Sequence, residues 1–296
     1  MLLNYNMIFR FLFLFATVCG FAQKNATPFE IEGINKNGVF GLTISPDGKE
    51  AFWVNSNGGR DTLAIMQSKK VNEKWQKPEI AKFSENLTWK NIDPMFSPDG
   101  KTLLFQSNRP VEGKSDRKRF DIWAVKKVNN GWSQEYHLGN TINTDDSESF
   151  ASMTKDGSVY FMKENPDGKG KSDIYVSRFV KGEFQTPINI GIPINTIERE
   201  SNPFIAPDES FILYFTTKPE GSFGEIDLLI SFNENGKWSE PKNLGSKINT
   251  TLAEFCPFYH KKEKRLYFSR QKNLPNKRME ENLFFIDFDP KDYKNK

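Results

Sequence analysis

The chain has few of the residues that most often carry catalytic chemistry. Only two of its 296 residues are cysteines, Cys19 and Cys256, and only two are histidines, His137 and His260. Neither histidine stands in a zinc-binding pattern. The sequence also lacks a Gly-x-Ser-x-Gly nucleophile elbow and a glycine-rich phosphate loop. These absences predict no metal site, no cofactor and no catalytic residue of the nucleophilic or metal-bound kinds.

An excess of charge of one sign is missing as well. Lysine and arginine together number 41, and aspartate and glutamate 38, so the formal net charge is +3. A charge so near balance argues against nucleic acid as a partner. Charge therefore gives little guidance to the kind of partner.

Long hydrophobic runs are rare, and the clearest one lies at the start. Residues 11–18 are apolar, follow a lone Arg10 and precede Gly20-Phe21-Ala22. The run is too short to span a bilayer, and this order predicts a signal peptide over residues 1–22, cut before Gln23. Lipoprotein processing at Cys19 is the alternative. We therefore expect an exported protein that is periplasmic, outer-membrane associated or secreted, with no transmembrane span in residues 23–296.

Helical periodicity is absent after residue 22, and a repeat takes its place. Each unit starts with a turn such as Ser97-Pro98-Asp99-Gly100, in which proline presets φ and glycine accepts a positive φ. The second turn residue recurs at positions 46, 98, 155, 207 and 261. An apolar strand, a loop of varying length and a third strand follow. A fourth strand then carries an aromatic residue 23 positions before the next turn's second residue: Trp75, Trp132, Phe184 and Trp238.

Four short strands per unit predict an all-β fold, a single β-propeller with five four-stranded blades over residues 23–296. The last unit lacks a fourth strand before the chain ends at Lys296. Residues 28–34 precede the first turn at the distance expected of an outer strand. We therefore expect this N-terminal strand to close the last blade, which would also cover an edge strand. A protein of this kind is expected to be a monomer.

The units resemble the WD40-like PD40 (TolB-like) propeller repeats of many secreted Bacteroidetes proteins. The resemblance is carried by the Ser-Pro-Asp-Gly-Lys turns, the Leu-Tyr-Phe strands and the Leu-Gly-x-x-Ile-Asn-Thr segments, and it covers about residues 28–290. It implies a binding or scaffold role at the cell envelope. The chain differs from TolB in having five units and no α/β domain ahead of them.

One repeated position points to a possible binding site. The residue seven places before each second turn residue is Val39, Asn91, Glu148, Glu200 or Glu254. This position precedes the innermost strand of each unit, so three glutamates could surround the channel mouth together with Asn91 and Asp146. Such an acidic mouth would bind a cation, an amine or a basic peptide. The alternative is structural, with each glutamate accepting backbone hydrogen bonds in its own unit.

Basic loops are expected on the same face, and they leave two functions open. Their cations include Arg109, Arg119 and Arg270, and the loop over residues 114–118 adds more. An acidic centre with a basic rim favours a non-enzymatic protein that binds an envelope protein or a glycan. The alternative is a glycoside-active enzyme that uses carboxylates at the mouth. One oddly placed acid in a deep cleft would favour the enzyme, because repeated acids indicate a structural or binding ring.

Overall fold

The computed structural model describes residues 25–34, 37–111, 119–129, 131–164, 171–217 and 221–294. The expected signal peptide with Cys19 and the basic loop over residues 114–118 lie outside the described residues. Within these ranges the structure is all-β apart from three short 3-10 helices, η1 (Lys82–Ser84), η2 (Pro275–Lys277) and η3 (Pro290–Tyr293). In the described ranges no helix has the length and apolar character needed to cross a membrane.

Each repeat forms an antiparallel meander of three strands. The first meander is β2 (Val39–Ile44), β3 (Glu50–Asn55) and β4 (Ala64–Val71), and the order inner, middle, third strand then recurs. The others are β7 (Asn91–Phe96), β8 (Thr102–Ser107) and β9 (Asp121–Val128); β12 (Glu148–Met153), β13 (Val159–Glu164) and β14 (Ser172–Ser177); β18 (Glu200–Ile205), β19 (Phe211–Thr217) and β20 (Ile226–Glu234); β23 (Ala253–His260), β24 (Arg265–Asn273) and β25 (Met279–Asp287).

The expected aromatic fourth strand is divided into two short pieces. The aromatic residues lie in β5 (Lys74–Trp75), β10 (Gly131–Trp132), β16 (Glu183–Phe184) and β21 (Lys237–Trp238), of which β16 pairs with β15 (Phe179–Val180). The outer edge is formed just after them by β6 (Glu79–Ile80), β11 (Tyr136–His137), β17 (Ile188–Asn189) and β22 (Lys242–Asn243). The aromatic rings pack between neighbouring meanders as expected, since Trp132 lies 5.7 Å from the ring centre of Phe52.

The sheets do not divide into five separate blades. β20 and β23 pair in parallel at one point, Ile226 with Ala253, so the fourth and fifth meanders share a nine-stranded sheet. The other meanders lie in sheets of five, five and four strands. At the far edge of the large sheet, β1 (Thr27–Pro28) pairs with β25, and the N–H of Phe29 donates to Leu283 O at 2.9 Å. The N-terminal strand is thus shorter than the expected 28–34 and begins one residue earlier.

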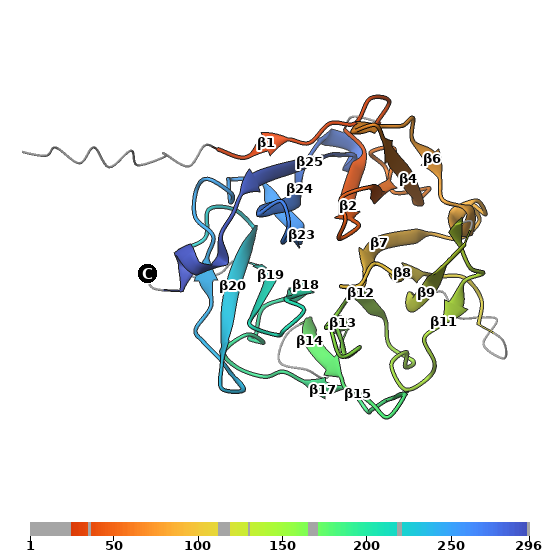
Figure 1. Cartoon of the computed structure of the whole chain (residues 1–296). Coiled ribbons are helices and arrows are strands. Elements are labelled where there is room, and N and C mark those ends of the chain that lie inside the picture. Colours follow the sequence, from red (N-terminus) through yellow and green to blue (C-terminus); the bar gives the residue numbers. More distant parts are fainter. Residues whose placement is uncertain are drawn as a thin grey trace, which may run out of the picture.

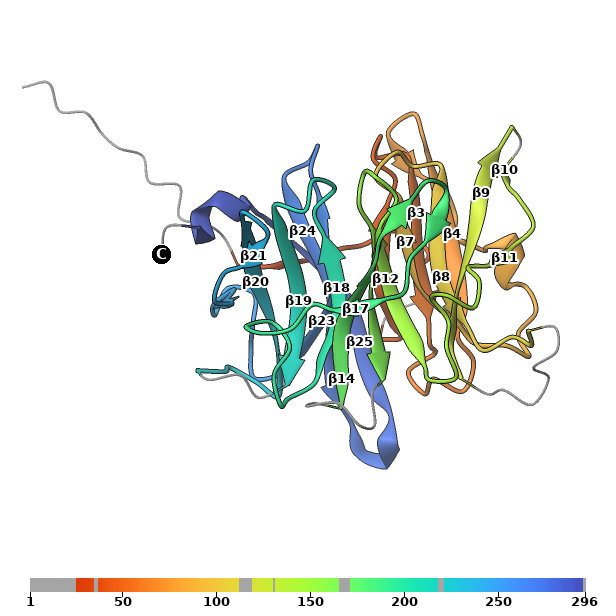
Figure 2. The same cartoon turned by 90° about the horizontal axis from the view of Figure 1, so that it is seen from below.

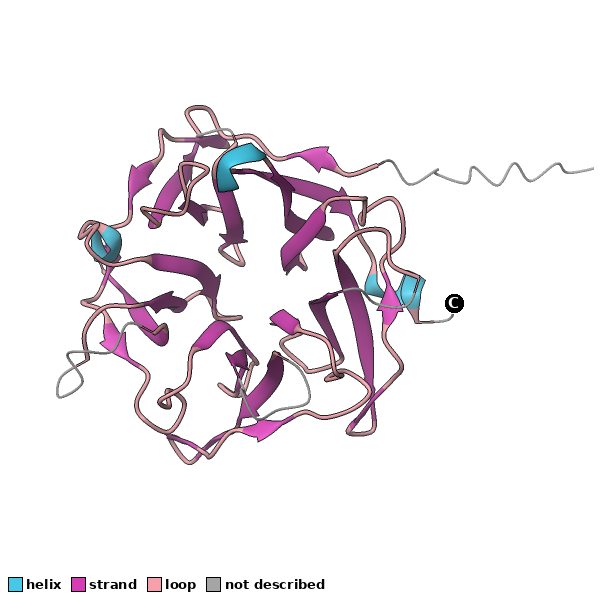
Figure 3. Ribbon diagram, turned by 180° about the vertical axis from the view of Figure 1, so that it is seen from behind, coloured by secondary structure: helices cyan, strands magenta, loops and turns pink. Residues whose placement is uncertain are grey.

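The meanders are arranged around a central axis. Figure 1 shows β2, β7, β12, β18 and β23 nearest the centre, and Figure 3 shows the same arrangement from behind. Seen from below, the strands run roughly side by side between two end faces (Figure 2). One face carries the Ser-Pro-Asp-Gly turns and is called the turn face here. The opposite face, where the inner strands begin, is called the entry face.

Every inner strand has a bulge partway between these two faces. Register shifts in all five strands place one residue with positive φ at the position five before the second turn residue. These residues are Gly41, Asp93, Phe150, Asn202 and Cys256, with φ between 47° and 65°. The N–H of Cys256 donates to Asn202 Oδ1 at 3.0 Å, and its thiol lies 3.6 Å from Asp93 Oδ1. Side chains from three inner strands therefore meet at the axis.

Candidate functional site

The three repeated glutamates are buried inside their own repeats. Glu148, Glu200 and Glu254 are each fully buried. One carboxylate oxygen of each accepts the N–H of the threonine four residues earlier at 3.0 Å, and the other accepts the threonine hydroxyl: Thr144, Thr196 and Thr250. Burial raises the pKa of Glu200, and the hydrogen bonds from Thr196 oppose that rise. These contacts correspond to the structural alternative and leave no exposed ring of carboxylates.

The other predicted mouth and rim residues are also engaged in contacts within the fold. Arg270 is 16% exposed, and its Nε donates to Glu254 Oε1 at 2.6 Å. Asn91 is buried, and its Oδ1 accepts from Arg109 Nη2 at 2.8 Å. Arg109 is itself buried and paired with Glu135. Arg109 and Arg270 therefore do not form an exposed basic rim, because their charges face buried partners.

Asp146 and Arg119 remain near the surface. Asp146 Oδ2 lies 3.2 Å from Lys163 Nζ, and its Oδ1 lies 3.6 Å from Arg119 Nη1. The side chains of Asp146 and Arg119 are 31% and 54% exposed. Of the predicted site residues, these two are the pair brought together at the surface, where the second repeat meets the third, rather than around the axis.

A different carboxylate lies at the axis. Asp93 occupies the bulge of β7, and its side chain comes close to Cys256 of β23. Of the five residues at this repeated position, Asp93 alone carries a carboxyl group. Burial raises its pKa to about 6, and the charge of Arg60 opposes that rise. Asp93 therefore keeps its proton to a higher pH than an ordinary aspartate does.

A second buried carboxylate stands near Asp93. Glu281 of β25 is fully buried and accepts from Ser56 Oγ at 2.6 Å and from Arg60 Nε at 3.1 Å. Its charge raises the pKa of Asp93 further. The guanidinium of Arg60 lies over the ring of Phe40 at 4.7 Å, and the side chain is 36% exposed. Arg60 is thus the most exposed member of this group. Asp93, Arg60 and Glu281 are called the Asp93 group below.

The sequence sets Asp93 apart in a way in which it does not set apart the repeated glutamates. Reading the position five before the second turn residue gives glycine, aspartate, phenylalanine, asparagine and cysteine. A position that changes its chemistry in every unit cannot serve one shared contact. Glu281 had no such signal, because it lies in the irregular last repeat.

The described residues hold no group of three His, Cys, Asp or Glu side chains that could bind a metal ion. His137 pairs with Asp121 at 3.1 Å, and His260 lies on the turn face with its Nε2 3.0 Å from Ser45 O. Cys256 is buried at the axis, as expected of a small apolar side chain, and burial raises the pKa of its thiol.

Comparison with known proteins supports the fold and stops short of a family. No family model matches the chain, and no curated protein matches it. The chain is similar to the structure of a BT0996 RGII complex, with 9% identity, a TM-score of 0.58 and coverage of 89% of this protein and 91% of the other. A structure described as a glycoside hydrolase gives 9% identity, a TM-score of 0.57 and the same coverage. The α-L-arabinofuranosidase of Podospora anserina, in complex with cellotriose, has 11% identity and a TM-score of 0.50, and the match covers 89% of this protein and 96% of the other.

These likenesses show the β-propeller fold, and the PD40 resemblance is supported only that far. They contradict the expectation of a non-enzymatic binding protein, because proteins that match along nearly their whole length are glycoside hydrolases. The enzymatic alternative is the better supported of the two. The chain also matches 36% and 35% of the length of two longer peptidase chains, with TM-scores of 0.46 and 0.44.

Proposed function

We propose that this protein is a glycan-active enzyme that cleaves a glycosidic bond on the entry face, with Asp93 as its proton donor. The observation that carries this proposal is the single carboxyl group at the axial bulge position, with its pKa raised to about 6 by burial. Hydrolysis of a glycoside needs one carboxylic acid that stays protonated and a second carboxylate. The repeated glutamates do not single out one acid, since each has the same threonine contacts within its own repeat.

In this proposal the members of the Asp93 group have different roles. Asp93 donates its proton to the glycosidic oxygen as the bond to the leaving sugar breaks, and a water molecule then bonds to the anomeric carbon and returns a proton to Asp93. The ionised carboxylate of Glu281 stabilises the positive charge that develops on the sugar ring. Arg60 orients Glu281 through the bond from its Nε at 3.1 Å, and its exposed part contacts the substrate. Arg60 is therefore a positioning residue for Glu281.

The architecture that we propose is one five-bladed propeller. Each of the five meanders, with its short outer strand, makes one blade, and β1 supplies the outer strand of the last. The β20–β23 pairing consists of one residue pair, Ile226 with Ala253, and in this architecture it links two neighbouring blades that remain separate. Residues 23–296 form this domain, which resembles PD40 repeats in its turns and third strands. Residues 1–22 direct its export to the envelope, where glycans are its partners.

The test is a hydrolysis assay on residues 23–296 with a panel of p-nitrophenyl glycosides and plant and bacterial polysaccharides. Asp93→Asn should lower kcat by about 10²- to 10⁴-fold, the usual contribution of a general acid. Asp99→Asn is the matched control, because Asp99 belongs to the same strand pair and bonds the Ser97 hydroxyl at 2.7 Å in the turn. It should leave kcat unchanged.

The pH profile adds a second readout. A proton donor must be protonated, so kcat/KM should fall as the pH rises through about 6, the pKa of Asp93. Lack of hydrolysis by the wild-type protein across the panel would refute the proposed activity. Hydrolysis that survives in Asp93→Asn would refute the assignment of the acid.

A further inference from the structure

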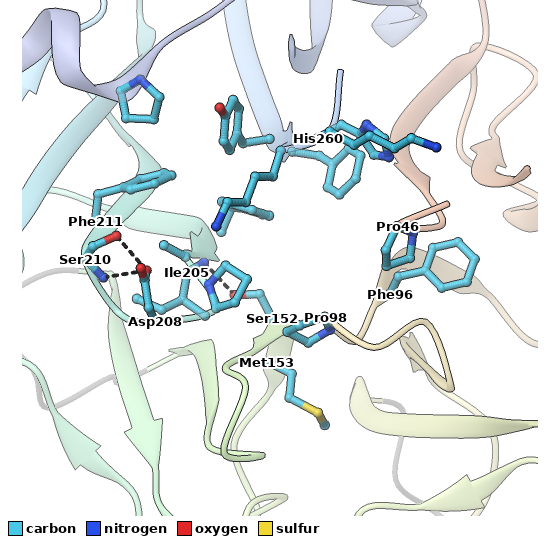
Figure 4. A pocket seen from close by; sticks show the side chains of 18 of the residues that line it. Pro46, Phe96, Pro98, Ser152, Met153, Ile205, Asp208, Ser210, Phe211 and His260 are labelled. Atoms are coloured by element: carbon cyan, nitrogen blue, oxygen red, sulfur yellow. Dashed lines mark hydrogen bonds between the residues drawn. The ribbon is translucent and has the colours of Figure 1, made fainter. Parts of the chain in front are cut away.

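A pocket on the turn face has a chemistry that the glycan proposal does not use. It has a volume of about 700 Å³, which is within the usual range for small-molecule sites. Its lining comes from the ends of the inner strands, from their turns and from η3. Figure 4 shows Phe96, Met153, Ile205 and Phe211 among the side chains around it. Asp93 is not among the lining residues, because it lies two positions before Met95 in β7, toward the entry face.

The walls of this pocket are mostly apolar, and Ser152, Asp208 and His260 have hydrogen-bond partners within the fold. Ser152 Oγ donates to Pro203 O at 2.6 Å and accepts from the N–H of Ile205 at 3.0 Å. Asp208 Oδ1 accepts from both the N–H and the hydroxyl of Ser210, as Figure 4 shows. His260 has its Nε2 3.0 Å from Ser45 O, and its Nδ1 accepts from the N–H of Glu263 at 3.2 Å. Sugar hydroxyls would lose water here without gaining hydrogen bonds, and this loss is costly.

The rim of the pocket is positively charged. Four exposed lysines line it, Lys261, Lys262, Lys291 and Lys294, against two aspartates, Asp208 and Asp289. Both aspartates accept hydrogen bonds within the fold, Asp208 from Ser210 and Asp289 from the N–H of Lys291 at 3.0 Å. Lys262 Nζ donates to Asp47 O at 3.2 Å. The four lysines outnumber the two aspartates, so the rim keeps a net positive charge, although, besides the hydrogen bond from Ser210, the nearby Lys261 lowers the pKa of the Asp208 carboxyl.

We propose that this pocket binds a small anionic amphiphile, a single-chain carboxylate whose apolar chain fills the pocket while its head group pairs with the lysines. The apolar chain of the ligand lies against four phenylalanine rings, Phe96, Phe204, Phe211 and Phe258. Burial of this ligand chain is the main source of affinity. The lysines select the charge of the head group. Asp93, Arg60 and Glu281 are all outside the lining of this pocket, so the two proposed sites take different ligands from opposite faces.

The proposal is tested by isothermal titration calorimetry with decanoate, decan-1-ol and decyltrimethylammonium. Decanoate should bind about tenfold more tightly than decan-1-ol, since several exposed ion pairs with the lysines each favour the charged head group modestly. The cation should bind more weakly than the alcohol. The variant Lys261→Ala/Lys291→Ala/Lys294→Ala should remove the preference for decanoate. The control Lys74→Ala/Lys77→Ala/Lys237→Ala, which changes three exposed lysines elsewhere, should keep it.

A second variant tests the location. Met153 lines the pocket and is only partly buried, so Met153→Glu should keep the fold, which far-UV circular dichroism checks, and weaken decanoate by more than tenfold. Equal binding of decanoate and decan-1-ol by the wild type would overturn the charge selection. Unchanged binding by Met153→Glu would overturn the site. Glycoside hydrolysis in the same samples reports on the other face, so the two proposals fail separately.

Discussion

Asp93→Asn should stabilise the protein at pH 8, which is unusual for a change at a buried polar residue. The pKa of Asp93 rises from an ordinary 3.8 to about 6 on folding, mainly through burial. A difference of about 2 pKa units corresponds to about 3 kcal/mol between the two protonation states. At pH 8 the carboxylate is charged in both the folded and the unfolded chain, so the folded state bears this whole penalty. Asparagine removes the charge and with it the penalty.

The backbone at this position accepts asparagine. Asp93 has a φ of 50°, and Asn202 holds the equivalent position in the fourth repeat with a φ of 55°. Asparagine is among the residues that tolerate this left-handed region best. Its amide oxygen can still accept from the thiol of Cys256, which lies 3.6 Å from Asp93 Oδ1. The stabilisation should therefore reach about 2 to 3 kcal/mol.

The measurement is urea unfolding of both proteins between pH 3.5 and pH 8. A raised carboxyl pKa means that the folded state binds more protons, so wild-type stability should fall relative to the variant as the pH rises from 3.8 to 6. Below this window the two proteins should converge, and above it the difference should stay constant. A variant that is less stable than the wild type at pH 8, or a difference that does not change with pH, would refute the reasoning.

Asp99→Asn gives the opposite sign and serves as the control. Burial raises the pKa of Asp99, but the hydrogen bonds from Ser97 and from the N–H of Lys101 outweigh it and leave that pKa lowered. The charged form of Asp99 therefore stabilises the fold above its unfolded pKa, and this contribution is lost as the pH falls. Asp99→Asn should consequently be less stable than the wild type at pH 8 and approach it in acid.

Two further predictions concern buried groups. Glu254→Gln should lower the free energy of unfolding in urea by about 3 kcal/mol, because it leaves the cation of Arg270 without its carboxylate. Glu200→Gln should lower it by only about 1 kcal/mol, because the groups that donate to Glu200 belong to threonines. Equal losses would contradict the assigned contacts. The thiol of Cys256 should resist iodoacetamide in the folded protein at pH 8 and react in urea, because burial raises its pKa. Mass spectrometry detects the alkylation, and an alkylated Cys256 in the folded protein would contradict its burial.

The repeating part of the fold could be predicted because its contacts are local. The serine and aspartate of a turn meet within three residues, as Ser97 Oγ and Asp99 Oδ1 do at 2.7 Å. The Leu-Gly-x-x-Ile-Asn-Thr segments also have a local purpose. Asn143 holds the third strand by accepting from the N–H of Ile122 and donating to its carbonyl oxygen. Asn195 and Asn249 do the same for Ile174 and Leu228.

The candidate site could not be predicted because it depends on side chains that are far apart in sequence. Asp93 and Glu281 come from β7 and β25, and Arg60 comes from the loop between β3 and β4. No spacing rule links these positions. The burial of the glutamates was open to prediction, however. A threonine stands four residues before Glu148, Glu200 and Glu254, and this repeated pair indicates a contact within the repeat rather than a ligand.

The difference between Glu200 and Asp93 separates structure from function in this fold. A contact that every repeat needs brings the same residue to the same position, so the repeated glutamates and threonines belong to the framework. The axial bulge has no shared contact, since it carries five different residues. Asn202 shows that an uncharged residue satisfies the same backbone, and Asp93 at that position costs stability near neutral pH. The framework does not need a carboxyl group at this position, whereas the proposed proton transfer to a substrate needs one.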